Sequence, residues 1–263
     1  MFEEPAQQLV AVNKCEGVYC GLVSDQAMLD NCVAYSAVDF PLVADANQVR
    51  DVQKGDLGAE EVWHCVTEHY QQFGLECLQW SFPLERVDRA VVSLLLERGF
   101  VEHRVMAMAT PAPLVLPIDE TLRMFPASSV EPHYTALQKE AHREFPVELA
   151  EQMVQHLLRR LGRPRLESYV AFDGKMPVGT LELLSVGPVG RIENVHVAAE
   201  HRRRGIATGM FAWIFNLCLQ RSRKCVCLSV AKDNPVAQEL YRKLGFQYVG
   251  DLVSYQSPKI RES

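Results

Sequence analysis

The sequence predicts an α/β protein in two parts, and three observations lead to this prediction. Alternating apolar segments typical of strands are interleaved with apolar residues at helical spacing. A proline-rich joint at 110–120 divides the chain, because three prolines within seven residues disfavour both a helix and a central strand. The same strand–helix–strand order is then found on both sides of the joint.

Size, composition and charge limit the classes of protein to which this chain can belong. The chain has 263 residues, of which 48% are hydrophobic and 23% charged, which is typical of one large or two ordinary globular domains. Its net charge of −6 argues against a general nucleic-acid binder. The acidic start MFEEPAQQLV is unlike a signal peptide, and no segment has the roughly 18 apolar residues of a membrane helix. We therefore expect a cytoplasmic protein without nucleic-acid or membrane partners.

The eight cysteines are scattered along the chain, and none forms a C-x-x-C pair. Scattered thiols in a reducing compartment usually act as small apolar core residues. We expect neither a disulfide framework nor a bound metal.

The second part can be divided into elements in order. Strands are predicted at 121–125, 168–172, 178–186, 191–197, 225–230 and 246–255, and helices at 130–145, 146–161, 206–217 and 234–244. The second helix has a clear apolar stripe, since Leu149, Met153, Leu157 and Leu161 recur four residues apart. The last helix has an asparagine N-cap, a proline at its first position and Gly245 beyond its end.

The first part contains a partial echo of the second. Residues 76–109 and 224–256 both run from a strand through a polar turn and an amphipathic helix into Gly-Phe and another strand. Two explanations stay open, a chance match or a duplicated fold. In a duplication Leu95 stands where Tyr241 stands, and residues 43–62 are the nearest substitute for the second part's arginine–glycine turn, with the strand-to-helix spacing lost.

The stretch VHVAAEHRRRGIATGM, residues 195–210, joins an alternating strand to an apolar helix through three arginines and a glycine. The first amides of a helix lack internal partners and lie at the positive end of its dipole. Small residues let a phosphate approach these amides, and guanidinium groups add charge. The stretch therefore predicts a diphosphate site, although a solvated basic loop would share these residues.

Two motifs together resemble the GNAT superfamily of acyl-CoA-dependent N-acyltransferases. One is R-x-x-G-x-A at 202–207, and the other is N-x-x-A-x-x-L-Y-x-x-x-G-F at 234–246. The resemblance covers residues 117–256 and implies a mixed, mostly antiparallel sheet flanked by helices. It implies a catalytic domain at 117–263, with 1–116 a degenerate GNAT-like or companion domain that lacks a coenzyme site and shapes the acceptor pocket.

The resemblance also implies the coenzyme contacts. The diphosphate would lie against Arg202, Arg203, Arg204, Gly205, Ile206, Ala207 and Thr208, and the pantetheine arm against Val195, Val197 and Asn234. Lys243 either binds a ribose phosphate or is an exposed helix cation.

Acyl transfer needs a neutral amine, donors for the tetrahedral oxyanion and a proton for the leaving thiolate. By the resemblance Tyr241 is the acid, and an amide near Val197 is the oxyanion donor. Alternation places Glu193 on the same strand face as Val195 and Val197, with His196 on the other. Glu193 is the first choice as base and His196 the second, and a mechanism without a dedicated base stays open.

The resemblance thus implies an N-acetyltransferase that moves an acetyl group from acetyl-CoA to a primary amine in a direct ternary complex. The alternative is a non-catalytic module that binds or senses acyl-CoA. Acceptor recognition is expected at 141–148, where a solvated loop would look the same. The sequence leaves the acceptor, the acyl length and the oligomeric state open.

Overall fold

A computed structural model describes residues 4–84, 87–111, 115–117 and 120–262. The chain forms two compact units, each assembled from three segments. Unit 1 is Met1–Cys15, Val105–Phe145 and Leu157–Asp251, and unit 2 is Glu16–Arg104, Pro146–His156 and Leu252–Ser263. The proline-rich joint includes residues 112–114 and 118–119, which lie outside the described residues, so the boundary between residues 116 and 117 stays a prediction.

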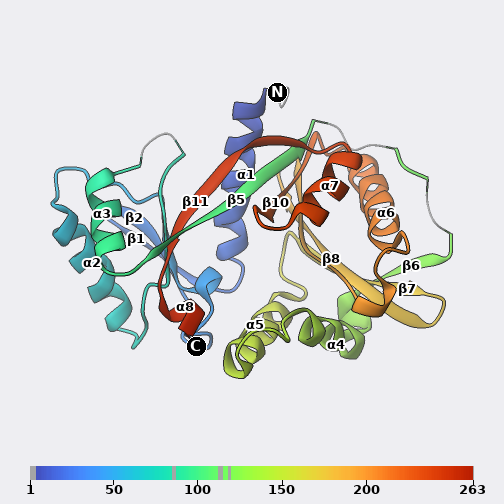
Figure 1. Ribbon diagram of the computed structural model, residues 1–263, viewed down its shortest axis with the longest axis horizontal. Helices are drawn as coiled ribbons and strands as arrows, with labels where there is room; N and C mark the ends of the chain where they lie inside the picture. Colours follow the sequence, from blue (N-terminus) through green and yellow to red (C-terminus); the bar gives the residue numbers. More distant parts are fainter. Residues whose placement is uncertain (1–3, 85–86, 112–114, 118–119, 263) are drawn as a thin grey trace. The chain divides into compact units, whose positions relative to one another are not determined.

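Unit 1 contains a mixed, mostly antiparallel sheet, as predicted. Its strands follow the order β5-β10-β9-β8-β7-β6. All of them except β9 are labelled in Figure 1. They are β5 (Val101–Thr110), β6 (Leu122–Pro126), β7 (Leu166–Asp173), β8 (Met176–Val186), β9 (Val189–Val197) and β10 (Cys225–Ala231). β9 and β10 are parallel, whereas the pairs β10–β5, β9–β8, β8–β7 and β7–β6 are antiparallel. The strands predicted between residues 121 and 230 all form.

The predicted helices of the second part also form. The helices of the described chain are α1 (Pro5–Cys20), α2 (Ala59–Gln71), α3 (Arg89–Glu97), α4 (Glu131–Ala141), α5 (Val147–Arg160), α6 (Ile206–Gln220), α7 (Pro235–Lys243) and α8 (Lys259–Glu262). α7 begins as its sequence predicts, because the Asn234 side chain accepts a hydrogen bond from the Ala237 amide at 3.1 Å. It is followed by Gly245 at φ 89°, a conformation that favours glycine.

The two faces of β8 are covered by different helices. Leu181 packs in one core cluster with Met210 of α6 and Tyr241 of α7. Glu182, the next residue, accepts a hydrogen bond from Tyr134 of α4. Because successive side chains of a strand point to opposite faces, α6 and α7 cover one face of this sheet and α4 the other.

Unit 2 has a smaller sheet in the order β1-β2-β3-β4-β11. Its strands are β1 (Asp25–Leu29), β2 (Cys32–Ser36), β3 (Gln48–Arg50), β4 (Gln79–Ser81) and β11 (Gln247–Gln256). β3 and β4 are parallel, as β9 and β10 are in unit 1. The core is aromatic, with Trp80 fully buried and stacked on Trp63 at 5.6 Å between ring centroids.

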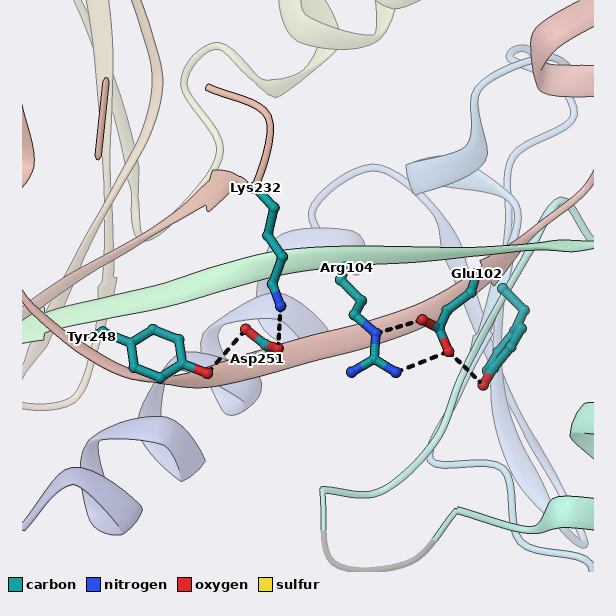
Figure 2. A network of polar contacts seen from close by, with 6 residues as sticks. Glu102, Arg104, Lys232, Tyr248 and Asp251 are labelled. Atoms are coloured by element: carbon teal, nitrogen blue, oxygen red, sulfur yellow. Dashed lines mark hydrogen bonds and ion pairs between the residues drawn. The ribbon is translucent and has the colours of Figure 1, made fainter. Parts of the chain in front are cut away.

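Each half of the chain lends its last strand to the other unit. β5, from the first half, pairs with β10, while β11, from the second half, pairs with β4. Both strands carry polar clusters (Figure 2). Asp251 of β11 accepts from Lys232 at 2.6 Å and from Tyr248 at 3.1 Å, and Glu102 of β5 is paired with Arg104. Because β5 and β11 each pair with a strand from the other half of the chain, this exchange could not be predicted from the sequence of either half alone.

The strand–helix–strand order that the sequence shows twice is confirmed as β4–α3–β5 and β10–α7–β11. One expectation about the first part is wrong. The connections from β3 to α2 and from β9 to α6 are both eight residues long, 51–58 and 198–205, so the strand-to-helix spacing is kept. The prediction failed because β3 is only three residues long and shows too little alternation to be located.

Seven of the eight cysteines are buried, as expected for core residues, and Cys65 is partly exposed. The buried ones are Cys15, Cys20, Cys32, Cys77, Cys218, Cys225 and Cys227. Burial raises the pKa of the Cys32 thiol to about 12 and that of the Cys218 thiol to about 11. Thiols with such pKa values stay protonated at neutral pH and are poor nucleophiles.

Candidate functional site

The main candidate site is a cavity of about 1000 Å³ in unit 1, between the end of β9, the start of α6 and the first turns of α7. It brings together ten of the predicted site residues. These are Val195, Val197, Arg202, Arg203, Gly205, Ile206, Ala207, Thr208, Asn234 and Tyr241. The predicted coenzyme turn and the predicted acid therefore line one hollow.

The turn before α6 is shaped for close approach by a ligand. Gly205 has φ 81°, and a Cβ built there would meet nothing within 4 Å. Arg203 also has a positive φ, 61°. No side chain caps the start of α6 within the described structure, so its first amides are left to other acceptors. An anion is the natural partner of this helix start.

The predicted cations differ in their placement. The Arg202 side chain donates to the Val197 carbonyl at 3.1 Å, and Arg203 lines the cavity. Arg204 does not line it, since its guanidinium pairs with Asp173 at 3.1 Å. Lys243 does not line it either and pairs with Glu239 on the exposed surface of α7. The structure thus assembles Arg202 and Arg203 with the turn and leaves Arg204 and Lys243 outside the cavity wall.

Tyr241 lies on the α7 side of the cavity. The residue is 8% exposed, and its ring packs 5.5 Å from that of Phe211 in α6. Burial raises the pKa of the Tyr241 phenol to about 12, and the nearby Glu193 carboxylate adds to this. The phenol is therefore protonated at neutral pH and has a proton to donate.

A second, smaller cavity of about 180 Å³ lies where β9 and β10 part. Their pairing ends at Arg191 and Cys227. Beyond this point Glu193 and Asn194 on β9 and Ser229 on β10 line the gap, together with Tyr241. The gap places a carboxylate and the phenol around one small space, wide enough for a few water molecules.

The two candidate bases have different surroundings. The Glu193 carboxylate pairs with the buried Arg191 guanidinium, which also donates to the Val12 carbonyl at 3.2 Å. His196 lines neither cavity, and its Nε2 lies 3.8 Å from Oε1 of Glu140. Burial lowers the pKa of His196, and the Glu140 carboxylate opposes this shift. Glu193 lines the gap between β9 and β10 that also reaches Tyr241, whereas the His196 ring lies beside Glu140 of α4.

The predicted strict alternation along β9 is wrong between Glu193 and His196. The register shifts there, so that Glu193 lies opposite Glu182 and His196 opposite Thr180. Thr180 and Glu182 are two residues apart on β8 and therefore lie on the same face. The cause is a bulge at Asn194, whose φ is 48°, and a bulge of this kind leaves no signal in hydrophobic periodicity.

Sequence reasoning missed several residues of the site. Ala237 and Leu240 of α7 line the large cavity between Asn234 and Tyr241. Helical spacing from Asn234 would have pointed to Ala237, three residues on. Asp173, which holds Arg204, gave no signal because it lies 31 residues from its partner in the sequence. Arg191 lies two residues before Glu193 on the same strand, so strand alternation would have pointed to it. The predicted acceptor loop at 141–148 stays a prediction.

Two negative findings apply to the described residues. No group of three or more histidine, cysteine or acidic side chains is placed to hold a metal ion. No helix in the described part of the chain combines the length and the apolar character needed to span a bilayer.

Comparison with known proteins gives a family match and a fold match. Residues 134–246 match the model of the acetyltransferase (GNAT) family. This segment runs from α4 to Phe246 and includes the large cavity and Tyr241. No curated protein matches the sequence.

Several solved structures share the fold over most of the chain. A GCN5-related N-acetyltransferase from Kribbella flavida matches with a TM-score of 0.65 at 16% identity, covering 95% of this chain and 96% of that one. One from Sphaerobacter thermophilus matches with a TM-score of 0.58 at 17% identity, covering 96% and 90%. A tandem GNAT protein from the clavulanic acid biosynthesis pathway matches with a TM-score of 0.51 at 14% identity, covering 75% and 69%. At these identities the likeness shows the fold alone.

Proposed function

We propose that this protein, whose residues 134–246 form a GNAT acetyltransferase domain, transfers an acetyl group from acetyl-CoA to a primary amine. One observation carries the proposal. The turn around Gly205 and the phenol-bearing face of α7 line the same cavity of about 1000 Å³. A diphosphate on the helix start and a proton donor beside it are what a coenzyme thioester requires.

The coenzyme would be bound mainly by backbone groups. In this proposal the amides that begin α6, with Arg202 and Arg203, hold the diphosphate. The pantetheine arm runs along Val195 and Val197, whose side chains line the cavity, and reaches Asn234 at the start of α7.

The chemistry needs one proton removed and one supplied. The neutral amine attacks the thioester carbonyl, and an amide near Val197 stabilises the oxyanion that forms. When the tetrahedral intermediate collapses, the C–S bond breaks and the thiolate takes a proton from Tyr241. The amine's proton passes to Glu193 through water in the small cavity, with His196 as the alternative acceptor. Glu193 is then protonated and Tyr241 is a phenolate, and proton exchange with solvent returns both groups to their starting states.

The first half is proposed to lack a coenzyme site. At the start of α2, the Glu61 carboxylate accepts a hydrogen bond from the Gly58 amide at 2.5 Å. The position that an anion would take is therefore occupied by the chain's own carboxylate. We place the reaction in the cytoplasm and a single coenzyme in each chain.

An acceptor screen tests the enzyme hypothesis against the alternative of a non-catalytic acyl-CoA sensor. The protein is incubated with acetyl-CoA and a panel of polyamines, amino acids, aminoglycosides and lysine peptides. Thiol release is followed, and products are identified by mass. Catalysis predicts amine-dependent thiol release with a product 42 Da heavier, the mass of a transferred acetyl group (about 42 Da). Tight coenzyme binding without turnover on any amine would favour the sensor.

A further inference from the structure

β9 is distorted at Asn194, immediately before the residues that line the large cavity. Asn194 has φ 48°, and the register with β8 shifts between Thr180 and Glu182. A residue other than glycine adopts this backbone conformation at a cost in free energy, so contacts with the surrounding structure must stabilise it. Val195 and Val197, which follow, line the cavity.

A fully buried carboxylate holds the distorted residue. Glu182 is 0% exposed, and its Oε2 accepts a hydrogen bond from Nδ2 of Asn194 at 2.6 Å. Its Oε1 accepts from the Ser168 hydroxyl at 2.7 Å and from the Tyr134 hydroxyl at 2.9 Å. A buried carboxylate is tolerated only where donors satisfy it, so three elements, α4, β7 and β9, are drawn to one side chain.

A second path from α4 ends at the same residue. Nε2 of Gln138 donates to Oγ1 of Thr180 at 3.0 Å, and the Thr180 hydroxyl donates to the Asn194 carbonyl at 3.4 Å. Asn194 is therefore held through its side chain and its backbone. Both paths begin on α4, the helix that leads to the predicted acceptor loop.

We propose that Glu182 is a positioning residue for the coenzyme strand. Through Asn194 it holds the bulge that aims the backbone of Val195–Val197, and through Tyr134 it ties that bulge to α4. The kinetic part of this inference rests on the proposed acetyl transfer. Its structural part, a β9 backbone held by a carboxylate, does not depend on any ligand.

Two variants break the link in different ways. Glu182→Gln keeps the size of the side chain but replaces one accepting oxygen by an NH₂ group. Because the partners of Glu182 all donate hydrogen bonds, this NH₂ group faces another donor. Asn194→Gly removes the side chain and still adopts positive φ easily. Ser168→Ala is the matched control, because it removes one donor to Glu182 without touching β9.

Hydrogen–deuterium exchange on the free protein and coenzyme A titration, with acetyl transfer kinetics, test the proposal. We expect Glu182→Gln and Asn194→Gly to speed exchange at 193–197. We also expect a lower affinity for coenzyme A and a kcat lower by about 10- to 100-fold, as misplacement near 1 Å commonly produces. Ser168→Ala should leave the exchange of 193–197 and kcat close to wild type.

Unchanged exchange at 193–197 in both folded variants would overturn the proposal, as would an equal effect of Ser168→Ala on kcat. If Glu182→Gln does not fold, Asn194→Gly decides the question, since it leaves Glu182 in place. Wild-type protein that fails to bind coenzyme A would refute the proposed function, while the exchange data would still decide whether Glu182 positions β9.

Discussion

Two strand–turn–helix segments of this protein, β9 with α6 and β3 with α2, have the same spacing and different chemistry at the helix start. Each connection has eight residues and ends in a glycine, Gly205 or Gly58. Gly205 has φ 81° and no side-chain cap follows it, whereas Gly58 has φ −73° and donates to the Glu61 carboxylate. One helix start is open to an external anion, and the other is closed by an internal one.

The next helices, α3 and α7, are alike in length and in their ends and differ at one position that matters for the proposed chemistry. α3 and α7 are both nine residues long, with N-caps Asp88 and Asn234 and a glycine at φ 84° or 89° after the last turn. The position of Tyr241 in α7 is taken by Leu95 in α3, which is fully buried. The fold tolerates either residue, so the difference between the two halves lies in a few side chains and not in the backbone plan.

Transplanting the α2 cap onto α6 should have the largest effect. Thr208 occupies the position in α6 that Glu61 occupies in α2, three residues after the glycine. We expect Thr208→Glu to weaken coenzyme A binding by about 100-fold or more, because like charges brought together cost several kcal/mol. Thermal stability should be unchanged or higher.

Isothermal titration with coenzyme A measures this effect, and Thr208→Gln is the control of equal size without the charge. Coenzyme binding at wild-type affinity by Thr208→Glu would show that the diphosphate does not sit on this helix start.

Removing the phenol that distinguishes α7 from α3 should have the next largest effect. We expect Tyr241→Phe to lower kcat by about 100-fold, the lower range for loss of a general acid, with coenzyme affinity retained. Because the pKa of Tyr241 is raised to about 12, the wild-type rate should show no fall from its deprotonation up to pH 10. Leu95→Ala in α3 is the matched buried change and should reduce stability but leave kcat per folded molecule unchanged.

The two candidate bases can be separated by pH profiles. A base must be deprotonated, so kcat/KM rises with pH through its pKa. We expect Glu193→Gln to lower kcat/KM by about 10- to 100-fold and to alter this rising limb, and His196→Gln to leave it in place. A rising limb below pH 6.5 that vanishes only in His196→Gln would reassign the base, since burial lowers the pKa of His196.

The same shift makes a prediction about stability. The pKa of His196 is lower in the folded protein than its ordinary value of 6.5, so the unfolded chain binds more protons around that pH. The contribution of His196 to the free energy of unfolding is therefore fully present above pH 6.5 and is lost as the pH falls below that value. Thermal unfolding of His196→Gln should depend less on pH between 7 and 5 than that of wild type. An identical dependence would show that His196 does not contribute.

The smallest expected effect concerns the arginine that the structure keeps outside the cavity wall. Asp173→Asn removes the partner of Arg204, an exposed pair of the kind worth about 0.2–1 kcal/mol. We expect coenzyme A to bind about two- to fivefold more tightly at low salt, with the gain lost at high salt. Asp173→Asn combined with Arg204→Ala is the control and should abolish the gain.

The sequence predicted the second half well because its signals are local. The start of α7 follows from Asn234 and Pro235, its end from Gly245, and the turn before α6 from Gly205, each within one helical turn of the feature it determines. The first half was predicted less well. β3 has three residues, too few to show a period.

What the sequence by itself determined is the chemistry available to the site: a helix start open to an anion, the arginines beside it and a tyrosine on the following helix. Tertiary structure alone decided which of these groups meet. Asp173 holds Arg204, and Glu182 holds the bulge at Asn194. The exchange of β5 and β11 is of the same kind. Such contacts join residues from different elements, and only packing brings them within hydrogen-bonding distance.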